Sequence, residues 1–155
     1  MQISGLMVDP VTNMPIVILK DDDDLHVLPI WVGVFEANAI ALKVEEIVPP
    51  RPMTHDLLHD VLSTVGAEVR RVIVSDLRDN TYYAVVELQL GEVSYAIDSR
   101  PSDALALALR ADAPVFVEES VLKLAESGVA QASEAERLRK WFDSLDPDDF
   151  SKYEM

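Results

Sequence analysis

A helix that is apolar on every side is the feature that most constrains how this chain can fold. Residues 104–109 read Ala-Leu-Ala-Leu-Ala-Leu, and Ser102 and Asp103 before them are typical of an N-cap and a first helical turn. Because this helix has no polar side, other elements or a second subunit have to surround it. The run therefore predicts a layered fold with this helix inside, and it also predicts a stable homodimer.

Short β-branched runs separated by turn residues predict strands on both sides of this helix in the sequence. The acidic turn Asp21–Asp24 indicates a hairpin, and the turns at 79–80 and 91–92 indicate a three-stranded antiparallel meander. The fold class is therefore α/β of the mixed α+β kind, with a largely antiparallel sheet packed with helices. The expected strands are 2–8, 15–20, 27–32, 68–77, 81–90, 93–98 and 114–117, and the expected helices are 35–46, 54–65 and 102–110.

A change in composition near residue 118 divides the chain. A length of 155 residues suits one domain, which we place at 1–118, followed by a C-terminal helical extension at 119–155. In this extension Ser133 opens a capping box with Glu136. The apolar stripe that follows has helical spacing and is expected to dock on the parent domain; it consists of Leu138, Trp141, Phe142 and Leu145.

The charge of the chain limits how it can bind nucleic acid. It has 13 Lys and Arg against 28 Asp and Glu, a formal net charge of −15, so its overall field repels polyanions. Any nucleic-acid role must therefore come from a local site helped by metal cations. The chain has no Cys, which excludes disulfides and thiolate metal sites. Without a transmembrane run or a signal peptide, we expect a cytoplasmic protein.

The segment 98–103, Asp-Ser-Arg-Pro-Ser-Asp, is the strongest candidate for a site. Asp98 ends a predicted strand and Asp103 opens the apolar helix, so both carboxylates can meet at one corner and hold a hard divalent cation. Arg100 lies where it can bind a phosphate beside the helix N-terminus. The alternative is structural: Asp98 pairs with Arg100, Ser102 caps the helix and Asp103 complements the helix dipole.

Two other segments contain residue types that can bind metal ions. His55 and His59 are four residues apart around Asp56 and could share zinc on one helix face, but no third ligand is evident in the sequence. Asp21–Asp24 lacks the Gly and the final Glu of an EF-hand loop, so a solvated hairpin turn is the better interpretation.

An ordered set of motifs along the chain resembles the bifunctional nuclease family. The set covers about residues 1–118 and consists of GLMVDP at 5–10, PIVILKD at 15–21, LPIWVGVFEANAIAL at 28–42, PPRPMTHDLL at 49–58, VIVSDLRDNTYYA at 72–84 and IDSRPSDALALALR at 97–110. The resemblance implies a mixed α/β domain with an antiparallel sheet, a homodimer, and nuclease activity on DNA and RNA.

Within these motifs the residue types suited to phosphodiester chemistry define a hypothesis for the site. Asp98 and Asp103 hold Mg²⁺ or Mn²⁺, Arg100 binds the scissile phosphate, and His55 is the general acid or base, oriented by Asp56. Glu36, Asp76 and Arg78 are secondary candidates. The rival hypothesis is a non-catalytic dimeric interaction or regulatory module. Convergence of these side chains in an open cleft favours the enzyme, whereas mutual pairing in a sealed corner favours the module.

Overall fold

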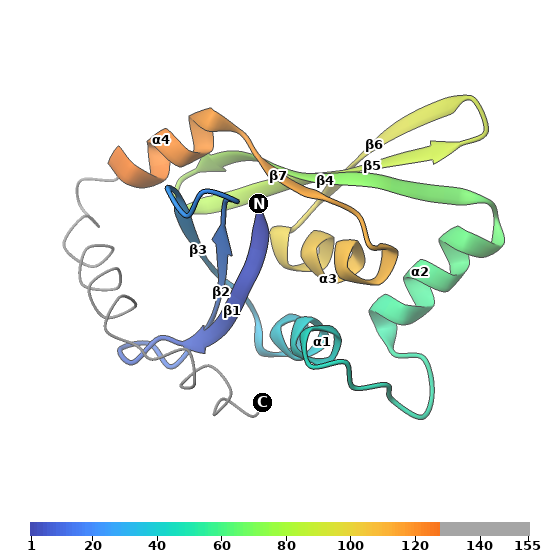
Figure 1. Ribbon diagram of the computed structural model, residues 1–155, viewed down its shortest axis with the longest axis horizontal. Helices are drawn as coiled ribbons and strands as arrows, with labels where there is room; N and C mark the ends of the chain where they lie inside the picture. Colours follow the sequence, from blue (N-terminus) through green and yellow to red (C-terminus); the bar gives the residue numbers. More distant parts are fainter. Residues whose placement is uncertain (128–155) are drawn as a thin grey trace.

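The computed structural model describes residues 1–127 and has a mixed α+β fold, as predicted. Two sheets contain the strands of this part of the chain (Figure 1). The first has the order β1-β2-β3 and the second the order β6-β5-β4-β7. The strands are β1 (Gln2–Val8), β2 (Pro15–Lys20), β3 (Val27–Trp31), β4 (Ala67–Arg78), β5 (Thr81–Leu90), β6 (Val93–Ser99) and β7 (Val115–Val117).

All neighbouring strands are antiparallel except β4 and β7. The expected hairpin joins β2 to β3 across Asp21–Asp24, and the expected meander is β4-β5-β6. Chain segments far apart in sequence meet in the parallel pairing, which sets Val72 opposite Val115. A largely antiparallel architecture is therefore confirmed, but it is divided between two sheets.

The helices are α1 (Val34–Val44), α2 (Thr54–Thr64), α3 (Pro101–Ala111) and α4 (Glu119–Ser127). Figure 1 shows α3 beneath the four-stranded sheet, with α1 below α3 and α2 beside it. No helix in the described residues is long and apolar enough to span a membrane.

The apolar helix α3 is enclosed by its own chain. It packs against α1, α2, β4 and β5, and its side chains from Ala104 to Ala108 are all buried. These residues share one core with apolar side chains of both sheets, including Val17 and Val72. The prediction that α3 lies inside the fold is confirmed. Its apolar character is satisfied within one subunit, so it no longer supports the expected homodimer.

The predicted N-cap of α3 is shifted by two residues. Arg100 is the N-cap of α3 and Pro101 is its first residue, so Ser102 lies buried in the first turn rather than capping it. Met53 is the N-cap of α2, ahead of Thr54. Proline suits the first helical position because its missing N–H has no partner there in any case. The tendency of Ser102 to cap is thus overridden by the proline before it.

The predicted C-terminal extension begins with a helix that packs on the domain. Val121 of α4 is fully buried and belongs to the main core, and α4 contacts β4. His26 Nδ1 in the β2–β3 turn lies 3.3 Å from Glu126 Oε1 of α4. The capping box at Ser133 and the predicted stripe at 138–145 lie outside the described residues.

Candidate active site

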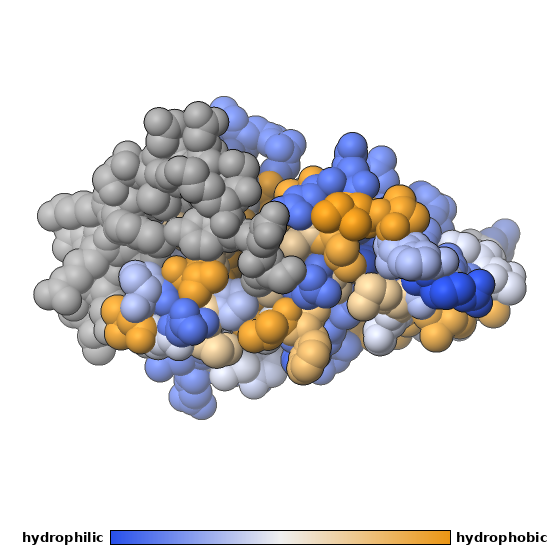
Figure 2. All heavy atoms as spheres, turned by 90° about the horizontal axis from the view of Figure 1, so that it is seen from below, coloured by the Kyte–Doolittle hydropathy of each residue, from blue (hydrophilic) through white to orange (hydrophobic). Residues whose placement is uncertain are grey.

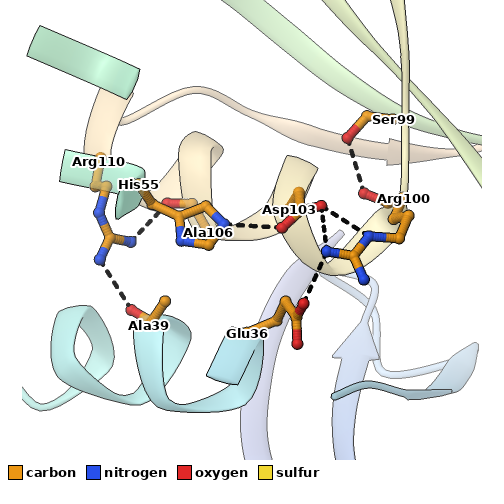
Figure 3. A network of polar contacts seen from close by, with 8 residues as sticks. All are labelled: Glu36, Ala39, His55, Ser99, Arg100, Asp103, Ala106 and Arg110. Atoms are coloured by element: carbon orange, nitrogen blue, oxygen red, sulfur yellow. Dashed lines mark hydrogen bonds and ion pairs between the residues drawn. The ribbon is translucent and has the colours of Figure 1, made fainter. Parts of the chain in front are cut away.

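Three helices contribute polar side chains to one hydrogen-bonded network (Figure 3). His55 Nε2 of α2 lies 2.8 Å from Asp103 Oδ1 of α3. Arg100 donates to Asp103 Oδ2 from Nε at 2.9 Å and to Glu36 Oε1 of α1 from Nη2 at 2.7 Å. Asp103 is therefore the centre of the network, with one oxygen facing an imidazole and the other facing a guanidinium.

The start of α3 explains how Arg100 and Asp103 come together. Arg100 has extended backbone geometry at the N-cap, and Asp103 lies in the first turn, three residues later. A carboxylate in the first turn is favourable because the unpaired N–H groups there carry partial positive charge. The hydrogen bonds to Asp103, and then to Glu36, raise the pKa of the Arg100 guanidinium above its ordinary value.

Glycine makes room for the Glu36 side chain. Gly33 is the N-cap of α1, and a Cβ atom built there would collide with the Glu36 carboxylate. The absence of a side chain at Gly33 lets Glu36 fold back over the start of its own helix towards Arg100. Glu36 is only a secondary candidate in the sequence analysis. The sequence gives no indication that Gly33 makes room for it, apart from the presence of a glycine.

A second cluster, centred on Arg110, joins the same three helices. Arg110 of α3 is only 3% exposed and donates from Nε to Asp56 Oδ1 of α2 at 2.7 Å. It also donates to the carbonyl of Ala106 at 2.9 Å and, across to α1, to that of Ala39 at 3.2 Å. This cluster links α3 to α1 and α2, the helices that carry Glu36 and His55.

The structure places Asp56 in contact with Met53 and Arg110 rather than with His55. Its Oδ2 accepts the N–H of Met53 at 2.9 Å and its Oδ1 accepts Arg110, so it does not orient His55. The Met53 hydrogen bond first, and then Arg110, lower the pKa of Asp56 below its ordinary value. His55 and Asp56 are neighbours in the sequence, but their side chains do not meet because adjacent residues on a helix point in different directions.

The network lies along the wall of an open groove. The groove has a volume of about 1000 Å³ and runs between α1, α2, α3 and the β5–β6 hairpin. His55, Asp98, Arg100 and Asp103 all line it, together with apolar residues such as Leu58 and Ile97. Arg100 is 66% exposed and Asp103 31%, whereas His55 is only 13% exposed. Four of the five site residues predicted from the sequence therefore line one groove.

The remaining candidates lie elsewhere or make no contact with the network. Asp98 is exposed at the end of β6, and no contact within the described residues joins it to Arg100 or Asp103. Asp76 pairs with Arg78 at 2.7 Å on β4, outside the groove. His59 lines a different and smaller cavity, so the two histidines of the zinc alternative do not face one site.

The contacts of Asp103 bear on whether these residues fit a divalent cation. Both of its oxygens already face nitrogen donors, and the described residues contain no group of three or more His, Asp or Glu placed to hold a metal. A cation between Asp98 and Asp103 would compete with His55 and Arg100 for the oxygens of Asp103. The side chains as they stand do not fit a metal ion, and the requirement for Mg²⁺ or Mn²⁺ stays a prediction.

Comparison with known proteins identifies the family. The family model described as bifunctional nuclease domain matches residues 17–130. The chain belongs to the bifunctional nuclease domain family. The match includes Glu36, His55, Arg100 and Asp103, so the whole network lies inside the family's domain.

Relatives of this chain fall into two groups. An uncharacterized protein of Mycobacterium tuberculosis is 35% identical over 96% of this chain and 96% of its own length. The protein named bifunctional nuclease 1 of Arabidopsis thaliana is 28% identical over 74% of this chain and 38% of its own length. The protein of the same name in Oryza sativa subsp. japonica is 26% identical over 73% of this chain and 35% of its own length. The chain thus spans little more than a third of the plant relatives.

Proposed function

We propose that this protein is a nuclease that hydrolyses phosphodiester bonds of DNA, RNA or both at the groove beside α3. The observation that carries the proposal is the His55–Asp103–Arg100–Glu36 network, which lines an open groove in a member of the bifunctional nuclease domain family. A general acid or base and a cationic phosphate ligand are the two groups that this reaction needs from a protein.

His55 and Asp103 form the acid–base pair of the proposed reaction. With the proton on Nε2 and donated to Asp103, Nδ1 of His55 is an acceptor that can take a proton from an attacking water. The water oxygen then bonds to phosphorus, the bond from phosphorus to the leaving oxygen breaks, and the leaving oxygen takes a proton from solvent water. The proton on Nδ1 of His55 then returns to solvent, which restores the base. Asp103 is a positioning residue, since its hydrogen bond holds the imidazole in one tautomer and one orientation.

Arg100 is the proposed phosphate ligand. Its Nε and Nη2 hold the two carboxylates, and no contact within residues 1–127 engages Nη1. The side chain is 66% exposed, so a phosphate oxygen can reach Nη1 from the groove. Glu36 and Asp103 thus hold the guanidinium in place and leave part of its donor set for the substrate.

The net charge of the chain sets conditions on substrate binding. The formal charge is −15, and three acidic residues, Glu36, Asp98 and Asp103, line the groove itself. Long-range attraction of a polyanion is therefore absent, and binding depends on contacts at the groove and on ionic strength. We expect weak substrate binding that improves as salt screens the repulsion, the opposite of a basic nucleic-acid-binding protein.

Purified variants assayed on labelled DNA and RNA test this proposal. We expect His55→Gln to lower kcat/KM by about 10²–10⁴-fold, and Arg100→Lys to raise KM. His26→Gln is the matched control, because His26 is exposed and pairs with Glu126 away from the groove. All variants are purified alongside the wild type, so a contaminating nuclease cuts equally in every sample. Equal cleavage by the wild type and His55→Gln would refute the proposed site.

One observation favours the non-catalytic module instead. Arg100 and Asp103 are mutually paired, and every buried side-chain nitrogen or oxygen in the described residues has a hydrogen-bond partner. Such a network can serve only to join α1, α2 and α3. The residues therefore show one feature of each hypothesis: they line an open groove, which favours the enzyme, and they pair with one another, which favours the module. If the wild-type protein cleaves neither DNA nor RNA, the non-catalytic module is the better hypothesis.

A further inference from the structure

One side of α1 faces the groove and carries an aromatic ring that is almost fully exposed. Phe35, Asn38, Ala39 and Leu42 line the groove, and their spacing places them on one side of the helix. Phe35 is 88% exposed, about twice the exposed fraction of any other aromatic side chain in residues 1–127. Figure 2 shows hydrophobic residues at the surface of the half of the molecule away from the grey residues. The ring of Phe35 therefore contributes little to the core and is free to contact a ligand in the groove.

Asn38, almost one turn further along α1, has a side-chain amide without a partner. The residue is partly buried, and no hydrogen bond within the described residues engages its amide. Every buried side-chain nitrogen or oxygen in this part of the chain has a hydrogen-bond partner, so the unpaired amide of Asn38 is open to the groove rather than sealed beneath it. An amide offers both donors and an acceptor, so Asn38 can form hydrogen bonds with a polar ligand beside Phe35.

The start of α1 lies beside the proposed phosphate ligand. Glu36, the residue after Phe35, accepts a hydrogen bond from Arg100 Nη2 at 2.7 Å. Other walls of the groove carry Leu58 of α2 and Ile97 of β6, which are 42% and 46% exposed. The groove therefore presents a guanidinium next to apolar and aromatic surface. A nucleotide has two matching parts, an anionic phosphate and a flat base with polar edges.

We propose, on the basis of the nuclease function above, that Phe35 and Asn38 form a subsite for a base of the substrate, next to the phosphate that Arg100 binds. The face of the base stacks on the phenyl ring of Phe35. The amide of Asn38 forms hydrogen bonds with the edge of the base, and adenine suits it because the N7 acceptor lies beside the N6 donor. Both residues bind the substrate, and neither takes part in the proton transfers.

The acidic charge of the protein explains why binding needs a contact with a base. At a net charge of −15 the long-range field opposes the approach of phosphates, and Arg100 already pairs with two carboxylates. Stacking on an aromatic ring involves no net charge, so this repulsion does not weaken it. One stacked base changes affinity by about 5–150-fold. Stacking on Phe35 can therefore supply affinity that ion pairs do not supply here.

Equilibrium dialysis of radiolabelled strands tests the subsite by binding alone. The ligands are a short oligodeoxyadenylate and an abasic strand of the same length, which keeps the sugars and phosphates but has no bases. His55→Gln protein is used throughout to keep the strands intact, which gel electrophoresis verifies. We expect the oligodeoxyadenylate to bind about tenfold or more tightly than the abasic strand. Equal binding of the two strands, or no binding of either, would overturn the proposal.

Substitutions in the same background identify the residues that bind the base. Phe35→Ala should weaken binding of the oligodeoxyadenylate by about 5–150-fold and leave binding of the abasic strand unchanged. Phe35→Leu keeps an apolar side chain without a flat ring and should also bind weakly, whereas Phe35→Trp should bind like Phe35. Asn38→Leu should weaken binding of the oligodeoxyadenylate only. Phe116→Ala is the matched control, because Phe116 is exposed on β7 and does not line the groove.

Separate outcomes distinguish a failure of this subsite from a failure of the nuclease function. Circular dichroism verifies first that each variant is folded. If folded Phe35→Ala binds the oligodeoxyadenylate like Phe116→Ala, or Phe35→Leu binds it like Phe35→Trp, the stacking contact is wrong even where the wild type cleaves nucleic acid. If the oligodeoxyadenylate binds through Phe35 but the wild type cleaves neither DNA nor RNA, the base subsite is supported and the proposed hydrolysis is wrong.

Discussion

Replacing Asp56 by Asn separates the structural cluster from the proposed catalytic network. The substitution keeps the size of the side chain but removes the negative charge beside Arg110, which is 3% exposed and cannot turn to water. An unpaired buried charge typically costs about 3–5 kcal/mol. Asp56 is itself 22% exposed, and two backbone carbonyls still accept from Arg110, so we take the lower end, about 3 kcal/mol.

Thermal and urea unfolding followed by circular dichroism measure this loss. For a chain of this length, about 3 kcal/mol corresponds to a fall in Tm of roughly 6–12 °C. Asp60→Asn is the matched control, since Asp60 is exposed on the same helix and its carboxylate makes no contact within the described residues. Kinetic assays below Tm should show nearly normal kcat for Asp56→Asn, because Asp56 does not touch His55.

The dependence on pH gives the prediction a second, independent readout. The pKa of Asp56 is lowered from its model-compound value of 3.8, so its ionised form is favoured by folding. Its contribution is therefore complete above that pH and is lost as the pH falls through the lower pKa of the folded state. The difference in Tm between the wild type and Asp56→Asn should become smaller below about pH 4. A Tm equal to that of Asp60→Asn near neutral pH would refute the reasoning.

Three further predictions concern the network and one loop. Gly33→Ala should push the Glu36 carboxylate away from Arg100 and reduce cleavage in the labelled-substrate assay, with little change in Tm. Cleavage should persist in EDTA if the network acts as arranged; loss in EDTA and in Asp98→Asn would support the predicted cation site instead. Trp31→Phe removes the 3.0 Å hydrogen bond from Nε1 to Asp9, the largest cause of the lowered pKa of Asp9, and should cost about 1–2 kcal/mol in urea unfolding.

Local patterns predicted the elements of this fold well. Strand alternation, the acidic hairpin turn and the apolar helix 104–109 are signals within a few residues of one another, and each was confirmed. The division into two sheets was not predictable in this way. It depends on contacts between strands that α1 and α2 separate in the sequence, and on the parallel pairing of β4 with β7.

The candidate site was predicted as a set of residues but not as a set of contacts. The motif 97–110 pointed to Arg100 and Asp103, which pair within one helical turn. His55 was paired with its neighbour in sequence, Asp56, although its actual partner is 48 residues away. The contacts of Glu36 with Arg100 and of Asp56 with Arg110 likewise span 64 and 54 residues, so only the packing of the helices determines them.

The parallel pairing of β4 with β7 has a consequence for the order of events during synthesis. Val72, Ile73 and Val74 of β4 each pair with a β7 residue that emerges 43 positions later, as Val72 and Val115 show. The β4-β5-β6 meander closes by local turns and can form as soon as its strands leave the ribosome. During translation of α3, one edge of β4 therefore remains unpaired, and its backbone is a template for intermolecular pairing. Ribosome pausing within this stretch is the condition under which a nascent chain of this protein is most exposed to aggregation.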